Sequence, residues 1–166
     1  PEGSTELPVR PKELYDGAIP SANSVALFNL VFLSRLTGDP QWEHQAQEQV
    51  RAFSGTVQSQ PQAFTYFLCA LDFFLRPGQE IIIAGEPQAT STQELLSALN
   101  LNYTPNKVAL VKSEQNAARL SKFAGYTDGL QVIEGQATAH VCRNGSCTDS
   151  TSDIQTMVDK IMGKTS

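Results

Sequence analysis

The sequence predicts an α/β protein, with an N-terminal segment of three helices followed by a small α/β layer that contains a mixed, partly parallel sheet. Apolar residues recur with helical spacing up to residue 75 and are followed by two β-branched runs, EIIIAG (80–85) and KVALVK (107–112). A helical stretch separates these runs, and a strand–helix–strand order implies a right-handed crossover and at least one parallel pair. We expect the sheet to finish antiparallel.

The first helix is the element around which the helical segment is organised. It follows a turn at Asp16 and Gly17 and ends at Gly38, which adopts left-handed backbone angles at little cost. Its apolar residues wrap most of the way round a helical wheel, so the helix is expected to be enclosed on nearly all sides. They are Val25, Leu27, Phe28, Leu30, Val31, Phe32, Leu33 and Leu36.

The next two helices differ in pattern. Asp39 and Pro40 begin a second helix with a single apolar stripe, so it should be half exposed. A third helix, from Pro61 to about Arg76, is again apolar on most sides, and Cys69 should lie in its core. Three helices cannot cover two enclosed ones, so we expect the cover to come from the α/β part, the remainder of a parent protein or a second copy of this chain.

In the second half of the chain, capping boxes at 91–94 and 152–155 predict the starts of two helices, and Ser113 should begin another helix between them. Two further short strands are expected at 131–133 and 137–142, joined by a turn at Glu134 and Gly135. The predicted domains are a flexible lead-in (1–14), a helical segment (15–78) and a small α/β domain (79–166).

Composition restricts the function. The 166 residues are 40% hydrophobic and 17% charged, with a net charge of −5, which indicates a globular chain and argues against nucleic-acid or anionic-membrane partners. No apolar run approaches the roughly 20 residues that span a bilayer. The chain shows no signal peptide and begins at Pro1, so we expect a processed piece of a cytoplasmic protein.

The residues before the first helix have two interpretations. Asp16, Ser21, Asn23 and Ser24 carry groups that could bind sugar hydroxyls in a cavity mouth. The same residue types form tight turns and helix N-caps. Glycoside hydrolysis usually needs two carboxylates, and the sequence pairs no second carboxylate with Asp16.

Cys142 and Cys147 flank an Asn-Gly pair, which favours a two-residue type I′ hairpin. That turn places the two cysteines opposite each other, close enough for a reversible cross-strand disulfide, and Arg143 would favour the thiolate. The alternative is a pair of reduced, partly buried cysteines.

No metal or cofactor site is predicted. His140 with the two cysteines gives at most three ligands at irregular spacing. The loop Gly85-Glu86-Pro87 lies where phosphate-binding loops sit, but it lacks G-x-G-x-x-G and a P-loop lysine, and Glu86 would repel an anion. We expect a structural loop there and no cofactor.

Three stretches carry a family resemblance: DGAIPSANSVALFNLVFLSRLTGD (16–39), PNKVALV (105–111) and AHVCRNGSC (139–147). In this order they resemble the C-terminal part of the spermatogenesis-associated thioredoxin-like family, which joins an N-terminal thioredoxin-like domain to a helical toroid. The resemblance implies an (α/α)6 toroid of the six-hairpin glycosidase type, similar to N-acylglucosamine 2-epimerase. This chain would hold only the closing helices and the α/β segment.

Three functions remain open at this point. The chain is a non-catalytic segment that completes the toroid and mediates interaction with the thioredoxin-like domain and toroid of its parent. Alternatively, it is part of a carbohydrate-active isomerase or hydrolase with a possible sugar ligand, or a redox accessory segment acting through its cysteine pair. The sequence does not decide whether the chain is an enzyme, and the resemblance implies sugar chemistry only through the shape of the toroid.

Overall fold

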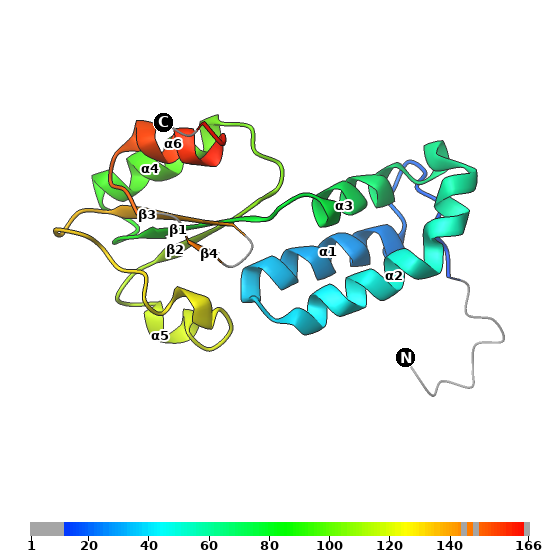
Figure 1. Cartoon of the computed structure of the whole chain (residues 1–166), viewed down its shortest axis with the longest axis horizontal. Helices are drawn as coiled ribbons and strands as arrows, with labels where there is room; N and C mark the ends of the chain where they lie inside the picture. The colour runs from blue at the N-terminus through cyan, green and yellow to red at the C-terminus, as the bar shows by residue number, and fades with distance from the viewer. Residues whose placement is uncertain (1–11, 144–145, 148–149, 165–166) are drawn as a thin grey trace.

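The computed structural model describes residues 12–143, 146–147 and 150–164, and within them it confirms the predicted α/β architecture with a mixed sheet. Figure 1 shows a helical part next to a sheet that is covered by further helices. The helical part consists of α1 (Ala22–Thr37), α2 (Pro40–Ser59), the 3-10 helix η1 (Pro61–Ala63) and α3 (Thr65–Leu75). The predicted lead-in lies mostly outside the described residues, and the proposed domain boundaries stay a prediction.

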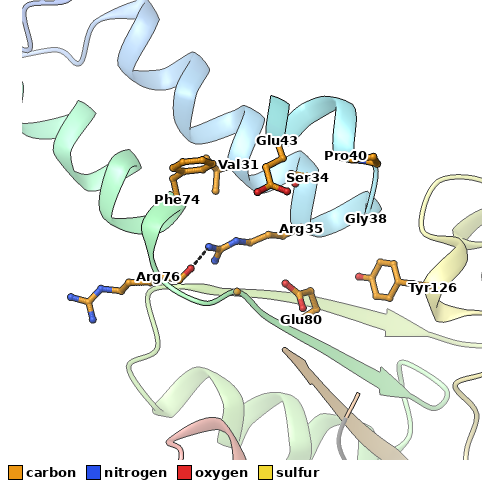
Figure 2. A pocket seen from close by; sticks show the side chains of 11 residues that line it. Val31, Ser34, Arg35, Gly38, Pro40, Glu43, Phe74, Arg76, Glu80 and Tyr126 are labelled. Atoms are coloured by element: carbon orange, nitrogen blue, oxygen red, sulfur yellow. Dashed lines mark hydrogen bonds between the residues drawn. The ribbon is translucent and has the colours of Figure 1, made fainter. Parts of the chain in front are cut away.

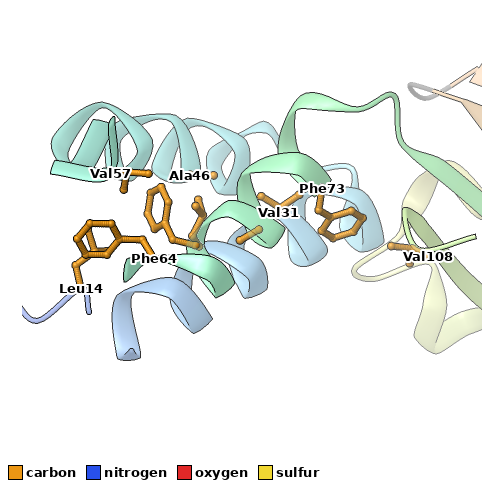
Figure 3. Packing of buried hydrophobic residues seen from close by; sticks show 10 residues of the cluster. Leu14, Val31, Ala46, Val57, Phe64, Phe73 and Val108 are labelled. Atoms are coloured by element: carbon orange, nitrogen blue, oxygen red, sulfur yellow. The ribbon is translucent and has the colours of Figure 1, made fainter. Parts of the chain in front are cut away.

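Helix α1 begins and ends as its sequence predicts. The hydroxyl of Ser21, its N-cap, accepts a hydrogen bond from the Ser24 amide, and Gly38 ends the helix in the left-handed conformation with φ of 72°. The helix lies between α2 and α3 (Figure 1), and side chains of all three helices form one core (Figure 3). Its buried residues are Leu14, Leu27, Val31, Ala46, Val57, Phe64, Phe67, Ala70, Phe73 and Val108.

Neither apolar helix is enclosed by the described residues. Val25 and Phe32 of α1 are each 37% exposed, and Leu75 of α3 is 70% exposed. Cys69 is exposed, so its predicted core position is wrong. The reason is geometric. Helix α1 packs against α2 and α3 on two sides, and no described element covers its third side. Helix α3 packs mainly against α1 through residues such as Phe67 and Ala70, and Cys69 lies on its uncovered side.

The sheet has the strand order β2-β1-β3-β4 within the described residues. Strands β1 (Gln79–Ala84) and β2 (Lys107–Lys112) are parallel, and helix α4 (Thr90–Leu101) connects them. Strands β3 (Thr138–Arg143) and β4 (Ser146–Cys147) complete the sheet in antiparallel pairs. The predicted parallel pair and antiparallel finish are therefore both confirmed.

The two faces of the sheet differ in chemistry. Helices α4 and α6 (Ile154–Ile161) cover one face with an apolar core that includes Ile81 and Ile83. The pairing places Glu80, Lys112 and His140 on the other face, together with Val108, and all four are buried. Helix α5 (Ala117–Leu120) and the 3-10 helix η2 (Gly125–Thr127) lie on this second side (Figure 1). Since Val108 belongs to the helical core, that core continues onto the sheet.

Several local predictions need correction. Residues 131–133 form no strand, only an isolated bridge between Ile133 and Gln136, because Glu134 and Gly135 turn the chain with φ of 52° and 71°. The predicted capping boxes do not cap. Helix α4 has Ala89 at its N-cap without a side-chain hydrogen bond, and Asp153, rather than its neighbour, caps α6. The helix expected from residue 113 is reduced to the short α5.

Two glycines should respond in opposite directions to alanine substitution. Gly38→Ala places a side chain at φ of +72°, so the free energy of unfolding should fall by about 1 kcal/mol. Gly55→Ala, within α2, meets nothing within 4 Å and should raise the free energy of unfolding by about 0.5–1 kcal/mol. Urea denaturation of both variants measures this, and a stabilising Gly38→Ala would contradict the left-handed helix end.

Candidate functional site

The structure brings three of the four predicted polar residues together around one carboxylate. The Oδ1 atom of Asp16 accepts from the Ser21 amide at 2.8 Å, and its Oδ2 atom accepts from the Ser24 hydroxyl at 3.1 Å. The same Oδ2 atom accepts from the amides of Tyr66 and Phe67, each at 2.9 Å. These amides belong to the first turn of α3, whose own N-cap residue makes no side-chain hydrogen bond. Asp16 therefore caps α3 from a distance and ties it to the start of α1.

The hydrogen bonds decide the ionisation of this carboxylate. Asp16 is buried, and burial alone would raise its pKa. The opposing hydrogen bonds from Ser21, Phe67, Ser24 and Tyr66 outweigh burial, and the pKa of Asp16 lies below the ordinary value of 3.8. The charged form is thus the one that stabilises the fold.

Asn23 has a separate role at the same turn. Its side-chain amide donates to the carbonyl of Glu13 at 2.5 Å, and its own carbonyl accepts from Gln49 of α2 at 2.6 Å. None of the four residues lines either of the two cavities described below. Sugar binding by this group stays a prediction.

The cysteine pair lies at the C-terminal end of β3, where this strand pairs with β4. Cys142 faces Cys147 across the β3–β4 pair, as the hairpin predicts, and the two are joined by a disulfide with Cα atoms 3.7 Å apart. Asn144 and Gly145, the predicted turn centre, lie outside the described residues. Cys142 is buried and Cys147 is exposed. The Arg143 guanidinium donates to the carbonyl of Lys160 at 2.8 Å, which links β3 to the end of α6.

A cavity of about 520 Å³, the junction cavity, lies where the helical part meets the sheet. Figure 2 shows side chains from α1, α2, α3, β1 and η2 around it. Arg35 of α1 donates to the backbone carbonyls of Asn106, at 3.2 Å, and Arg76, at 2.8 Å, as well as to that of Phe73. Its guanidinium carbon also lies 4.1 Å from the centre of the Phe73 ring. Burial lowers the pKa of Arg35, and the charges of Glu80 and Glu43 oppose that shift.

The opposite wall of the junction cavity carries a protonated tyrosine. The Tyr126 hydroxyl is buried and has no hydrogen-bond partner among the described residues, and in Figure 2 it points toward Glu80. Burial and the nearby Glu80 charge raise the pKa of Tyr126 to about 12. It therefore remains a hydrogen-bond donor at neutral pH, which suits a polar ligand. The sequence signal that we missed is Arg35, the only charged residue in α1.

A second cavity of about 790 Å³, the strand-end cavity, lies at the carboxyl ends of β1 and β2. Gly85 follows β1 at its edge, and Lys112 and Ser113 mark the end of β2. The parallel pairing could have indicated this place, because parallel strands end at the same edge of a sheet.

The described part of the chain shows neither a membrane-spanning helix nor a metal-binding cluster. No described helix is both long enough and apolar enough to cross a membrane. No group of three or more histidine, cysteine, aspartate or glutamate residues is placed to hold a metal ion, as far as the described residues go.

Comparison with known proteins finds the same protein from three mammals. The chain is 35% identical to rat spermatogenesis-associated protein 20 over 147 residues, which cover 89% of this chain and 19% of the rat protein. It is 35% identical to the human protein over 142 residues and 33% identical to the mouse protein over 147 residues. The chain is homologous to spermatogenesis-associated protein 20.

The homology covers only part of these relatives. The chain spans about a fifth of the length of these relatives and matches the C-terminal part of spermatogenesis-associated protein 20, which is linked to a thioredoxin-domain-containing family. No protein-family model matches the chain. No solved structure matches it.

Removing the charge of Asp16 should weaken the helical part. Asp16→Asn keeps the size of the side chain but replaces one oxygen by an NH₂ group, which cannot accept from amides. We expect the free energy of unfolding to fall by about 3 kcal/mol, measured by urea denaturation. The matched control is Asp39→Asn at the exposed N-cap of α2, where Asn caps as well as Asp and the change should stay within about 0.5 kcal/mol.

The stability that Asp16 contributes should decrease as the pH falls. Because the folded-state pKa of Asp16 lies below 3.8, the stability it contributes is complete above the unfolded pKa of about 3.9 and is lost as pH falls through the folded value. The gap between wild type and Asp16→Asn should be constant from about pH 7 to 5 and narrow below about pH 4. An unchanged gap at pH 2 would reject this account.

Proposed function

We propose that this chain is an interaction segment of a larger protein, whose remaining helices cover the open side of α1. In the toroid that the family resemblance implies, α1 to α3 would be closing helices, and the rest of the toroid would supply the cover. The segment itself is non-catalytic in this proposal. Its homology with about a fifth of spermatogenesis-associated protein 20 supports a role within a longer protein.

The observation that carries the proposal is the composition of the open side of α1. The side chains exposed there are apolar except for one: Ala22, Val25, Ala26, Asn29 and Phe32. The exposed side of α2 is polar by contrast, with Gln41, Glu43, His44, Glu48 and Arg51. Both helices belong to the same three-helix core, so the difference reflects the α1 surface itself. An exposed helix side composed mainly of apolar residues is typical of interaction sites.

The first experiment reads the coding sequence upstream and expresses that upstream polypeptide separately. We expect it to bind this chain, and calorimetry measures the affinity. The double variant V25S/F32S should weaken binding about tenfold, because burying the exposed third of each side chain contributes about 0.5–1 kcal/mol. Leu101→Ser is the matched control, since Leu101 is 86% exposed at the end of α4, and it should leave the affinity unchanged.

Two results would contradict the proposal. One is a reading frame that contains nothing upstream of this chain. The other is a homodimer, seen by sedimentation, that V25S/F32S dissociates, since a second copy would then occupy the same surface.

The disulfide favours a second candidate function, thiol–disulfide exchange. An incoming thiolate of a dithiol, such as that of a thioredoxin-like domain, would attack the exposed Cys147 sulfur. The Cys142–Cys147 bond would break, the dithiol would close to a disulfide, and two electrons and two protons would pass to this chain. The exposure of Cys147 supports this direction of attack.

Thiol counting tests this candidate directly. We expect one titratable thiol in the isolated chain, from the free and exposed Cys69, and three after treatment with a dithiol reductant. Mild reoxidation should return the count to one, and the variant C142S/C147S should give one under both conditions. Three thiols in the wild type before and after mild oxidation would reject the redox role.

A further inference from the structure

The strand-end cavity has the position at which open α/β sheets commonly bind ligands, outside the carboxyl ends of parallel strands. At about 790 Å³ it is large enough for a small organic molecule. Three independent features inside it favour an anion.

The first feature is the start of α4. This helix of 12 residues begins at the cavity, where Ser91 and Thr92 line it, and its N-cap Ala89 offers no side chain to the free amides. The first-turn amides of a helix have no intrahelical acceptors and carry a partial positive charge. An oxyanion placed there accepts hydrogen bonds from these amides and is attracted by the partial positive charge.

The second feature is the Thr92 side chain. It is fully buried and lines the cavity, and its hydroxyl has no hydrogen-bond partner among the described residues. A buried hydroxyl without a partner costs about 1–3 kcal/mol. The Thr92 hydroxyl fits next to residue 85 because that residue is glycine. A Cβ atom on Gly85 would lie 2.5 Å from the Thr92 hydroxyl oxygen. A ligand oxygen would supply the missing partner.

The third feature is the buried ammonium of Lys112. Two of its three N–H groups donate to the carbonyls of Thr127, at 2.5 Å, and Asp128, at 3.1 Å. It forms no ion pair among the described residues, so its positive charge is not neutralised by a carboxylate. Among the residues that line the cavity, Glu86, Glu114 and Asp128 are acidic. All three are exposed, so water weakens their repulsion of an anion without removing it.

We propose that the strand-end cavity binds a small molecule that joins an oxyanion to a body rich in hydroxyl groups, such as a sugar phosphate. In this proposal the phosphate lies at the start of α4, next to Thr92. Lys112 lines the same cavity from the other face of the sheet and contributes its positive charge. The hydroxyl groups of the body donate to the rim carboxylates, which accept hydrogen bonds from a neutral group and repel a second anion. The site is independent of the interaction surface on α1.

Calorimetry on the full chain tests the site with three probes: inorganic phosphate, glucose 6-phosphate and glucose. Glucose 6-phosphate should bind, inorganic phosphate should bind more weakly, and glucose should not bind. Affinity for glucose 6-phosphate should fall with rising salt, because the contacts are charged.

Thr92→Val is the decisive variant because it keeps the shape and removes only the hydroxyl. We expect about a tenfold loss of affinity for glucose 6-phosphate, as for one hydrogen bond to a charged group, with an unchanged or higher melting temperature. Thr90→Val is the matched control: Thr90 is exposed at the first position of α4, does not line the cavity, and should keep the wild-type affinity. Lys112→Met should abolish binding if the variant folds.

Three results would overturn the proposal. They are binding of glucose as tight as that of glucose 6-phosphate, wild-type affinity in Thr92→Val, and no binding of any of the three probes at millimolar concentration. Thr92→Val retains its meaning even if Lys112→Met fails to fold.

Discussion

Arg35 links the helical part to the chain segments that lead into the sheet. From the last turn of α1 it donates to carbonyls at the end of α3 and in the loop before β2, so a single guanidinium joins three segments that are far apart in the sequence. Three backbone acceptors and the face of Phe73 suit the planar, five-donor geometry of arginine and not that of lysine. Because the junction cavity is built around this contact, its shape depends on it as well.

The alternation of side chains along the strands explains why buried polar residues lie on one face of the sheet. Its α4–α6 face is an ordinary apolar core, but the alternate residues of the same strands carry Glu80, Lys112 and His140 to the opposite face. Burial is the largest influence on His140, and it lowers the pKa of the imidazole, as does the neighbouring Lys112 charge. Glu80 reaches the junction cavity and Lys112 the strand-end cavity, so one polar face supplies a charged group to each.

Much of this fold was predictable, because hydrophobic periodicity reports which side of an element is buried. The three helices, the parallel β1–β2 pair, the Gly38 stop and the Cys142–Cys147 register all follow from local pattern. The start of α2 at Asp39 and Pro40 was also predictable from residue type. The cap of α3 was not, since Asp16 caps it from about fifty positions away. The cavities were missed for a related reason: Arg35, Tyr126 and Thr92 come from separate elements and converge only through packing.

The interior of this acidic chain holds both acidic and basic residues: Asp16, Glu80 and Lys112 are all buried. The net charge is −5, and the Arg76–Asp72 ion pair and the His44–Glu48 contact are both exposed. The partly buried cations Arg35, Lys107, Lys112 and Arg143 instead donate to backbone carbonyls. A carbonyl satisfies the donor without neutralising its charge, whereas a carboxylate does both. These side chains therefore keep their positive charge, and it acts at shorter range and with less screening than the charge of the exposed acidic residues.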